Sequence, residues 1–259
     1  MPFPNFRNKH LHDSMFSPQD FTAYKKLLGQ VPRGRPPEGV IVCYDEKLMK
    51  TIVEKNKTKK LGFFVGDFYL VSEKGNKIGI IGNFGIGAPA AVIALEELIA
   101  LGVKKFITIG SAGTLSRHLK EGDIVLCDRA IRDEGTSSHY IKHSKYSFPS
   151  KSITEKIKKL LDESGQKYFM GTSWTIDSPY RETVAEARRY QKEDVLTVEM
   201  EASALFAVAG YRKVEMGALF TISDSLAELE WKPKFHTKEF KKSLENVFEI
   251  AKKVLMEKK

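Results

Sequence analysis

The stretch Val198-Glu199-Met200-Glu201-Ala202-Ser203 joins a short predicted strand, 195–199, to an apolar helix predicted over 201–211. It contains two carboxylates, and burying them costs free energy unless hydrogen-bond partners compensate. Acidic residues also suit a helix N-terminus, because the helix dipole favours negative charge there. The functional alternative is that at least one carboxylate accepts hydrogen bonds from two vicinal hydroxyls of a ligand, as the acidic residue that binds a ribose does.

The same alternation of strand and helix recurs along the chain, which predicts a mostly parallel or mixed sheet with helices on both faces. No linker or internal repeat separates the two halves, so we expect one domain over residues 1–259, with an irregular N-terminal segment, 1–38. The predicted strands are 39–44, 61–72, 77–83, 106–109, 123–127, 168–174, 195–199 and 216–222, and the predicted helices are 18–28, 45–55, 89–102, 150–164, 182–192, 201–211 and 237–257.

Composition limits the classes of function. Of the 259 residues 42% are hydrophobic, and the net charge is +9. The lysines interleave with acids, and no zinc-finger spacing or basic–aromatic stripe accompanies them, so we expect no nucleic-acid partner. No apolar run is long enough for a membrane span, residues 1–7 lack the apolar core of a signal peptide, and Cys43 and Cys127 form no metal or disulfide pattern. We therefore expect a cytoplasmic protein without a membrane or metal partner.

Four polar stretches follow predicted strands, where ligands bind in such folds. A turn is predicted at Gly110-Ser111-Ala112-Gly113, whose backbone and hydroxyl groups could bind an anion. Short Gly-Ser turns are also common where no ligand binds. Ser223-Asp224 offers either a general acid or a simple helix cap. Trp174 offers either a ring that stacks on a base or a core residue, and residues 132–137 form a polar loop. Together these groups match what the cleavage of a nucleoside requires.

The order and spacing of six motifs resemble those of the nucleoside phosphorylase-I superfamily, which includes purine nucleoside phosphorylases, uridine phosphorylases and several nucleosidases. The resemblance runs over roughly residues 39–256. It implies a single α/β domain whose mixed, partly barrelled central sheet has helices on both faces. It also implies a homo-oligomer (dimer, trimer or hexamer) with shared active sites. The motifs are Gly85-Ile86-Gly87-Ala88-Pro89, Gly110-Ser111-Ala112-Gly113, Gly122-Asp123-Ile124-Val125, Trp174 to Tyr180, Val198 to Ser203 and Ser223-Asp224.

The resemblance implies roles for individual residues. Asp224 matches the general acid that protonates the purine N7. The resemblance also implies that phosphate is a co-substrate and that no metal or other cofactor takes part. The implied ribose contacts are Glu201, Met200, Glu199 and, from a neighbouring subunit, His10; the implied base contacts are Trp174, Ala112, Gly113 and Asp224; and the implied phosphate contacts are Ser111, Gly110, Lys59 and Arg132.

Two arginines that bind phosphate in the family's phosphorylases are missing. Tyr44-Asp45-Glu46-Lys47-Leu48 replaces the Gly-Asp-Pro-x-Arg loop, and Thr108 replaces the arginine before the Gly-Ser motif. Each charge-assisted contact is worth about 1.5–3 kcal/mol, so either another cation binds phosphate or water is the nucleophile. The segment Glu134-Gly135-Thr136-Ser137 also resembles a loop of short AMP nucleosidases, which use water. The alternative phosphate cations are Lys47, Lys59, Arg132 and Arg181, and the alternative partners of the catalytic Asp are Lys238 and His236.

The sequence favours phosphorolysis of a purine nucleoside to free base and ribose 1-phosphate. The uridine enzymes read uracil with a Gln and an Arg shortly after the Tyr180 position, and Arg181-Glu182-Thr183 does not reproduce that pair. Because Arg181 can reach a pyrimidine carbonyl, uridine phosphorylase stays open. Two more functions stay open as well: a hydrolytic nucleosidase that acts on a nucleoside or AMP, and a non-catalytic nucleoside-binding protein.

Overall fold

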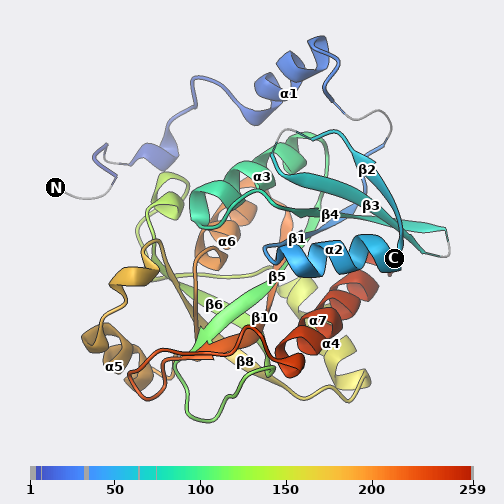
Figure 1. The fold of residues 1–259 in the computed structure, drawn as a ribbon. Helices are drawn as coiled ribbons and strands as arrows, with labels where there is room; N and C mark the ends of the chain where they lie inside the picture. The colour runs from blue at the N-terminus through green and yellow to red at the C-terminus, as the bar shows by residue number, and fades with distance from the viewer. Residues whose placement is uncertain (1–3, 7, 32–34, 64, 74, 258–259) are drawn as a thin grey trace.

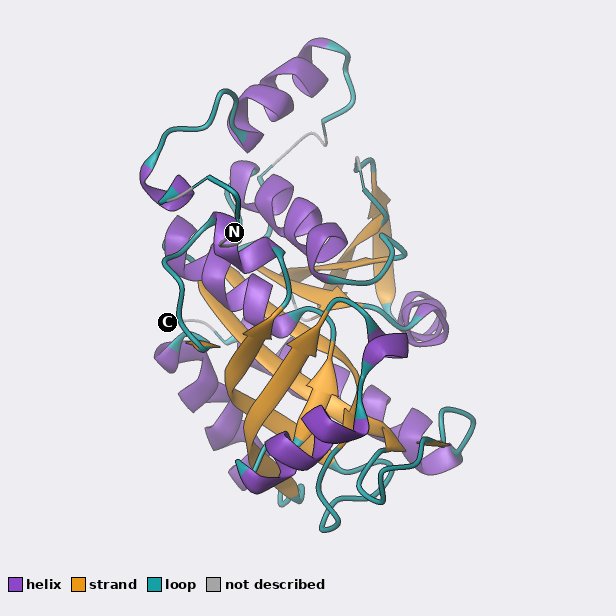
Figure 2. Cartoon of the chain, turned by 90° about the vertical axis from the view of Figure 1, so that its left-hand side faces the viewer, coloured by secondary structure: helices purple, strands orange, loops and turns teal. Residues whose placement is uncertain are grey.

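The computed structural model describes residues 4–6, 8–31, 35–63, 65–73 and 75–257. One mixed sheet runs through the molecule, and helices cover both of its faces (Figure 1, Figure 2). Its strands are β1 (Gly39–Cys43), β2 (Lys57–Leu61), β3 (Asp67–Glu73), β4 (Asn76–Gly82), β5 (Lys105–Thr114), β6 (Ile124–Asp133), β7 (Tyr146–Ser147), β8 (Tyr168–Ile176), β9 (Thr197–Glu199), β10 (Glu215–Ser225) and β11 (Lys232–Pro233).

The strand order in the sheet is β11-β10-β6-β8-β9-β5-β1-β4-β3-β2, with β7 paired to β6. β10 also pairs with β5 in parallel, from Glu215 opposite Lys105 to Ser225 opposite Thr114. This second pairing closes β5, β10, β6, β8 and β9 into a barrel, while β1 to β4 continue the sheet outside it. The predicted mixed, partly barrelled sheet is confirmed.

The helices pack in two layers. Apolar residues of α3 and α6 meet in one core cluster on one face of the sheet, and those of α2, α4 and α7 meet in another. The helices are α1 (Pro18–Leu27), α2 (Glu46–Lys55), α3 (Ala88–Ala100), α4 (Lys151–Glu163), α5 (Val184–Lys192), α6 (Ala202–Arg212) and α7 (Lys238–Met256), and the short 3-10 helices are η1 (Lys9–Leu11), η2 (Thr136–His139) and η3 (Pro179–Arg181).

Each predicted helix and strand coincides with an observed one, but β5 is much longer than expected. The predicted strand ended at residue 109, with Gly110-Ser111-Ala112-Gly113 as a turn, and this turn prediction was wrong. The ladder to β10 continues past all four residues, so they are extended strand. β6 is also longer than predicted, because its ladder to β8 continues to Asp133 opposite Ile176. β2, β7 and β11 were not predicted, and the predicted strand 61–72 corresponds to β3.

The N-terminal segment lies over α3. Ser17 and Asp20 form a capping box at the start of α1, which begins at residue 18 as predicted, and α1 contacts α3. All side chains of α1 stay at least partly exposed. In the described ranges no helix is both long and apolar enough to cross a membrane, and no group of three or more His, Cys, Asp or Glu residues there is arranged to hold a metal ion.

Candidate active site

The candidate site lies along the last part of β5. Ser111 is the one exposed residue among the ten of β5, all of which the structure describes, and Gly110 and Ala112 beside it are buried. Side chains approach the strand at both ends of this open segment. A Cβ at Gly110 would lie 3.1 Å from Tyr44 Cδ2, and one at Gly113 would lie 3.0 Å from Asp224 Oδ2. Gly110 and Gly113 are about 10 Å apart along an extended strand, and residues three apart on a strand face opposite sides, so Tyr44 and Asp224 mark the two ends of this stretch of β5 from different faces.

Glu201 lies at the Tyr44 end of this segment, between β9 and α6. The N–H of Gly87, which begins α3 with a positive φ of 92°, donates to Glu201 Oε1 at 2.6 Å. Burial, and then the neighbouring carboxylate of Glu199, raise the pKa of Glu201 to about 8. A Cβ at Gly87 would lie 4.0 Å from Met200 Cε. Glu201 and Met200, both expected at the ribose, therefore lie beside the glycine motif that precedes α3.

Glu199 is also buried, but its oxygens already accept four hydrogen bonds. The donors are the hydroxyls of Ser173 at 3.3 Å and Thr175 at 2.5 Å, and the backbone N–H groups of Glu201 at 2.8 Å and Ala202 at 2.7 Å. Burial raises its pKa. This geometry makes Glu199 an anchor for the start of α6, which does not support the expected ribose contact.

Asp224 lies at the other end of the segment, where a register shift after Ile222 sets it opposite Gly113. The hydroxyl of Ser223 lies 2.6 Å from Oδ1, and the indole N–H of Trp231 donates to Oδ2 at 3.0 Å. Burial raises the pKa of Asp224, and both hydrogen bonds oppose that shift. The carboxyl is therefore held near the strand by neutral donors, in an environment that favours its protonated form.

Trp231 takes the place that the sequence assigned to Lys238 or His236, both of which are exposed. No local pattern marks Trp231, because its approach to Asp224 depends on β11 pairing back onto β10. The indole N–H is the partner of the carboxyl that sequence reasoning missed.

Glu182, just after η3, is a second carboxyl near Asp224. Burial, followed by the charges of Asp224 and Glu186, raises the pKa of Glu182 to about 7. The packing of α5 explains this proximity, because Gln191 donates hydrogen bonds to the carbonyls of Leu115 at 3.1 Å and Ala227 at 3.0 Å. These bonds tie α5 to the segments that follow β5 and β10.

Trp174 is completely buried. Its indole N–H donates to Asp133 Oδ2 at 2.9 Å, and its ring lies 4.7 Å from that of Tyr190. A ring without exposed surface has no face for a nucleobase, so this placement does not support the expected stacking role. Local sequence cannot separate a core Trp from a stacking one.

The expected phosphate cations do not gather at Ser111 within one chain. Arg132 donates to Ser137 Oγ at 2.8 Å and to the Lys142 carbonyl at 2.8 Å, which binds it to its own loop. Lys59 is exposed on β2, with β3, β4 and β1 between it and β5. Lys47 is exposed on α2 and lines, with Tyr44, a cavity of about 440 Å³ beside the site.

Thr108, which replaces one of the family's two arginines, touches Tyr44, which stands at the glycine position of the other arginine's loop. Leu48, at the position of that second arginine, is buried on α2. Thr108 Oγ1 donates to the Tyr44 hydroxyl at 3.2 Å. Burial, followed by the nearby charge of Glu201, raises the pKa of Tyr44 well above its ordinary value. A neutral pair, Thr108 and Tyr44, therefore borders the site beside Glu201, and neither of the two arginine positions, Thr108 and Leu48, carries a charge.

His10 lies in η1, half-buried over its own chain. It borders a cavity of about 660 Å³ whose walls include Pro89 and Ile93. The neighbouring Lys9 Nζ lies 2.9 Å from His139 Nδ1 of η2.

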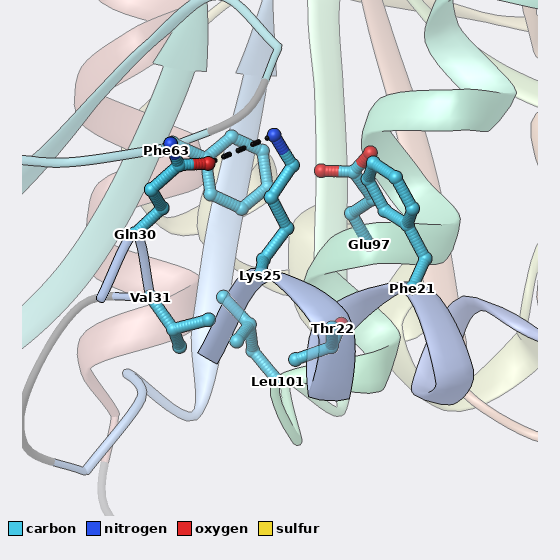
Figure 3. A pocket seen from close by; sticks show the side chains of 8 residues that line it. All are labelled: Phe21, Thr22, Lys25, Gln30, Val31, Phe63, Glu97 and Leu101. Carbon is cyan, nitrogen blue, oxygen red and sulfur yellow. Dashed lines mark hydrogen bonds between the residues drawn. The ribbon is translucent and has the colours of Figure 1, made fainter. Parts of the chain in front are cut away.

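A separate cavity lies between α1 and α3. Figure 3 shows Glu97 projecting from α3 towards Phe21 and Lys25 of α1, with Lys25 hydrogen-bonded to Gln30 at 3.0 Å. Its volume is about 20 Å³, the room of a single water, so it is no candidate for a substrate site.

Comparisons with known proteins show which family this chain resembles. The family model described as "Phosphorylase superfamily" matches residues 38–257. The chain is 30% identical to a guanosine phosphorylase of Halorubrum lacusprofundi over 55% of this chain, and this match spans 59% of that protein, less than two thirds of its length. It is 30% identical to a DeoD-type purine nucleoside phosphorylase of Streptococcus thermophilus over 70% of this chain and 82% of that protein. The crystal structure of uridine phosphorylase from Vibrio fischeri ES114 superposes with a TM-score of 0.75 at 27% identity, over 87% of this chain and 93% of that one.

Proposed function

Because this chain belongs to the phosphorylase superfamily, we propose that it is a nucleoside phosphorylase that cleaves a purine nucleoside with phosphate, giving free base and ribose 1-phosphate. The observation that carries the proposal is that two buried carboxyls, Glu201 near Tyr44 and Asp224 beside Gly113, lie near the two ends of the β5 stretch that holds the exposed Ser111. A nucleoside laid along this segment would have its sugar at Glu201 and its base at Asp224.

The reaction needs opposite electrostatics at the two ends. As the glycosidic bond lengthens, positive charge develops on the ribose and negative charge on the base. The carboxyl of Glu201 binds the vicinal hydroxyls and stabilises the sugar charge when it is ionised. Asp224 gives its proton to the purine N7, so the bond's electron pair leaves with a neutral base. A phosphate oxygen then bonds to C1′, with the exposed Ser111 hydroxyl as a donor to the anion.

Asp224 is the reason to prefer a purine. Burial raises the pKa of the Asp224 carboxyl, which suits it to give a proton to N7, and a pyrimidine has no N7. The guanosine and DeoD-type purine phosphorylases among the relatives agree with this preference. The likeness to a uridine phosphorylase structure keeps uridine as the alternative base.

Phosphate binding calls for cations that one chain does not bring to Ser111. We propose that a neighbouring copy in a homo-oligomer supplies them, because Lys59 stands exposed on the edge strand β2. The buried free thiols of Cys43 and Cys127 are in keeping with action in a reducing cytoplasm.

Hydrolysis is the second candidate function, and the hydrogen bond between Thr108 and Tyr44 favours it. Thr108 and Leu48 stand where the family's phosphorylases have arginines, and each lost charge-assisted contact is worth about 1.5–3 kcal/mol to a bound phosphate. Water needs no such charge. In that reaction the same Glu201 and Asp224 act, and the products are ribose and free base.

The deciding experiment incubates the purified protein with guanosine, inosine, uridine and AMP, each with and without phosphate, and measures free base and ribose 1-phosphate. Phosphate-dependent release of base from the purine nucleosides supports the proposal. Equal release without phosphate refutes phosphorolysis and establishes hydrolysis. Release from uridine alone refutes the purine preference, and binding without release refutes enzymatic cleavage.

A further inference from the structure

Trp231 is a largely exposed aromatic residue held against a buried carboxyl. Its side chain is 65% exposed, whereas Asp224 is 9% exposed. β11 follows directly and pairs with β10, with Pro233 opposite Asp224 and Lys232 opposite Ser225. The strand pairing returns the chain to the site, and the indole N–H then reaches Asp224 Oδ2 at 3.0 Å.

The direction of this hydrogen bond determines where a proton on the carboxyl can lie. An indole N–H only donates, so Oδ2 is an acceptor and a proton on Asp224 lies on Oδ1. Oδ1 is 2.6 Å from Ser223 Oγ, which is in turn 3.3 Å from the carbonyl of Ala112. The Ser223 hydroxyl can therefore accept from Oδ1 and donate to that carbonyl, and every group in the chain of bonds is satisfied.

We propose that Trp231 is the positioning residue of the general acid: it occupies Oδ2, directs the transferable proton to Oδ1, and stabilises the carboxylate that remains after transfer. This inference rests on the proposed function. In the step, the Oδ1–H bond breaks and an N7–H bond forms on the purine. The electron pair of the C1′–N9 bond stays with the base, and an oxygen of phosphate or water bonds to C1′.

The other charged groups near Asp224 come from two neighbouring segments. Glu182 faces it from the end of η3. On the β11 side, Lys232 Nζ lies 4.0 Å from Glu230 Oε2, and Lys234 contributes its backbone N–H to the Ser223 carbonyl at 2.8 Å. On the β5 side the facing residue is Gly113, which has no side chain. Removing the indole N–H therefore changes one donor and leaves these charges in place.

The test compares Trp231→Phe with the unmodified protein on guanosine and on 7-methylguanosine, with and without phosphate. Phe keeps a ring and removes the donor. On guanosine we expect kcat to fall about tenfold, the effect of one hydrogen bond to a charged group. The bond favours the charged carboxyl, so its loss raises the pKa of Asp224, and the alkaline limb of the rate profile moves up by about one pH unit.

The methylated nucleoside separates positioning from general damage. Its base carries a positive charge already and leaves without a proton on N7, so its rate in Trp231→Phe should stay within about twofold of the unmodified protein, as expected when acid catalysis is not required. Phe148→Leu is the matched control, since Phe148 is a 62% exposed aromatic, and it should change neither substrate's rate. Thermal unfolding establishes that both variants are folded.

Two results overturn the inference alone: an equal loss on both nucleosides, which indicates a structural role, or an unchanged rate and pH profile on guanosine. If the unmodified protein cleaves neither nucleoside, the proposed function fails and this inference fails with it.

Discussion

Replacing Glu201 with Gln should make the protein more stable and less active. The carboxyl is 8% exposed, and its pKa rises from an ordinary 4.5 to about 8. Below pH 4.5 it is protonated in both states. Between pH 4.5 and about 8 the unfolded chain releases this proton while the folded chain keeps it, so folding stability falls as pH rises. At pH 7 the loss is about 3 kcal/mol, from roughly 2.5 pH units at 1.36 kcal/mol each.

Gln keeps an oxygen for the Gly87 N–H and has no proton to lose, so Glu201→Gln should escape this penalty. Urea unfolding at pH 5, 6, 7 and 8 should show its advantage over the unmodified protein growing with pH, towards about 3 kcal/mol at pH 7. On guanosine its kcat/KM should fall about 10- to 100-fold through weakened hydroxyl contacts. Glu155→Gln, an exposed site on α4, is the matched control and should change neither quantity.

Two outcomes would refute this reasoning. A stability difference that stays constant from pH 5 to 8 would show that Glu201 is not a buried acid with a raised pKa. Unchanged kinetics in a folded variant would remove Glu201 from the site.

Three further predictions concern other groups. Asp224→Asn should slow purine cleavage by about 10²- to 10⁴-fold, whereas Asp194→Asn, an exposed control, should not; a loss of only a few-fold would exclude the acid. Glu182→Gln removes a buried carboxyl whose pKa rises from 4.5 to about 7, so its stability advantage over the unmodified protein should grow as pH rises from 5 to 7; a urea-unfolding difference that stays constant over that range would contradict it. Arg212→Met removes the two donors that bind the carboxylate of Glu96 at 2.8 Å, and Glu96 is only 6% exposed. Urea unfolding should show that the free energy of unfolding falls by about 2–3 kcal/mol, a value already reduced for the partial exposure of Arg212. A fall below about 0.5 kcal/mol would mean that the pair acts like a surface ion pair.

Sequence patterns predict this fold well where the signal is local. The helices follow from apolar periodicity and from caps such as Ser17 with Asp20. β5 was misjudged because glycines punctuate loops in most sequences, whereas here the long ladder to β10 keeps Gly110 to Gly113 extended. That ladder joins segments about a hundred residues apart, and no local window contains it.

The site, like the fold, has residues that the sequence indicates and residues that only the tertiary structure identifies. Glu201 could be singled out as a carboxylate on an apolar stretch, whereas Asp224 was equally a helix cap until the family resemblance gave it a role. The structure places Glu201 near Tyr44 and Asp224 beside Gly113 of β5. The two tryptophans show what local sequence cannot predict. Trp174 is 0% exposed and Trp231 is 65% exposed, yet each has polar neighbours in the sequence and lies in or beside a strand. The ring of Trp174 packs against Tyr190, whereas the exposed ring of Trp231 is held by its hydrogen bond to Asp224.

The contrast between these two tryptophans has a spectroscopic consequence. The sequence contains only these two, so the intrinsic fluorescence of the protein is the sum of a shielded indole and a water-exposed one. Acrylamide should quench the exposed emitter first. Because the exposed indole is bonded to Asp224, its emission is expected to respond when a ligand arrives there, and the chain thus carries a reporter of occupancy that needs no added dye.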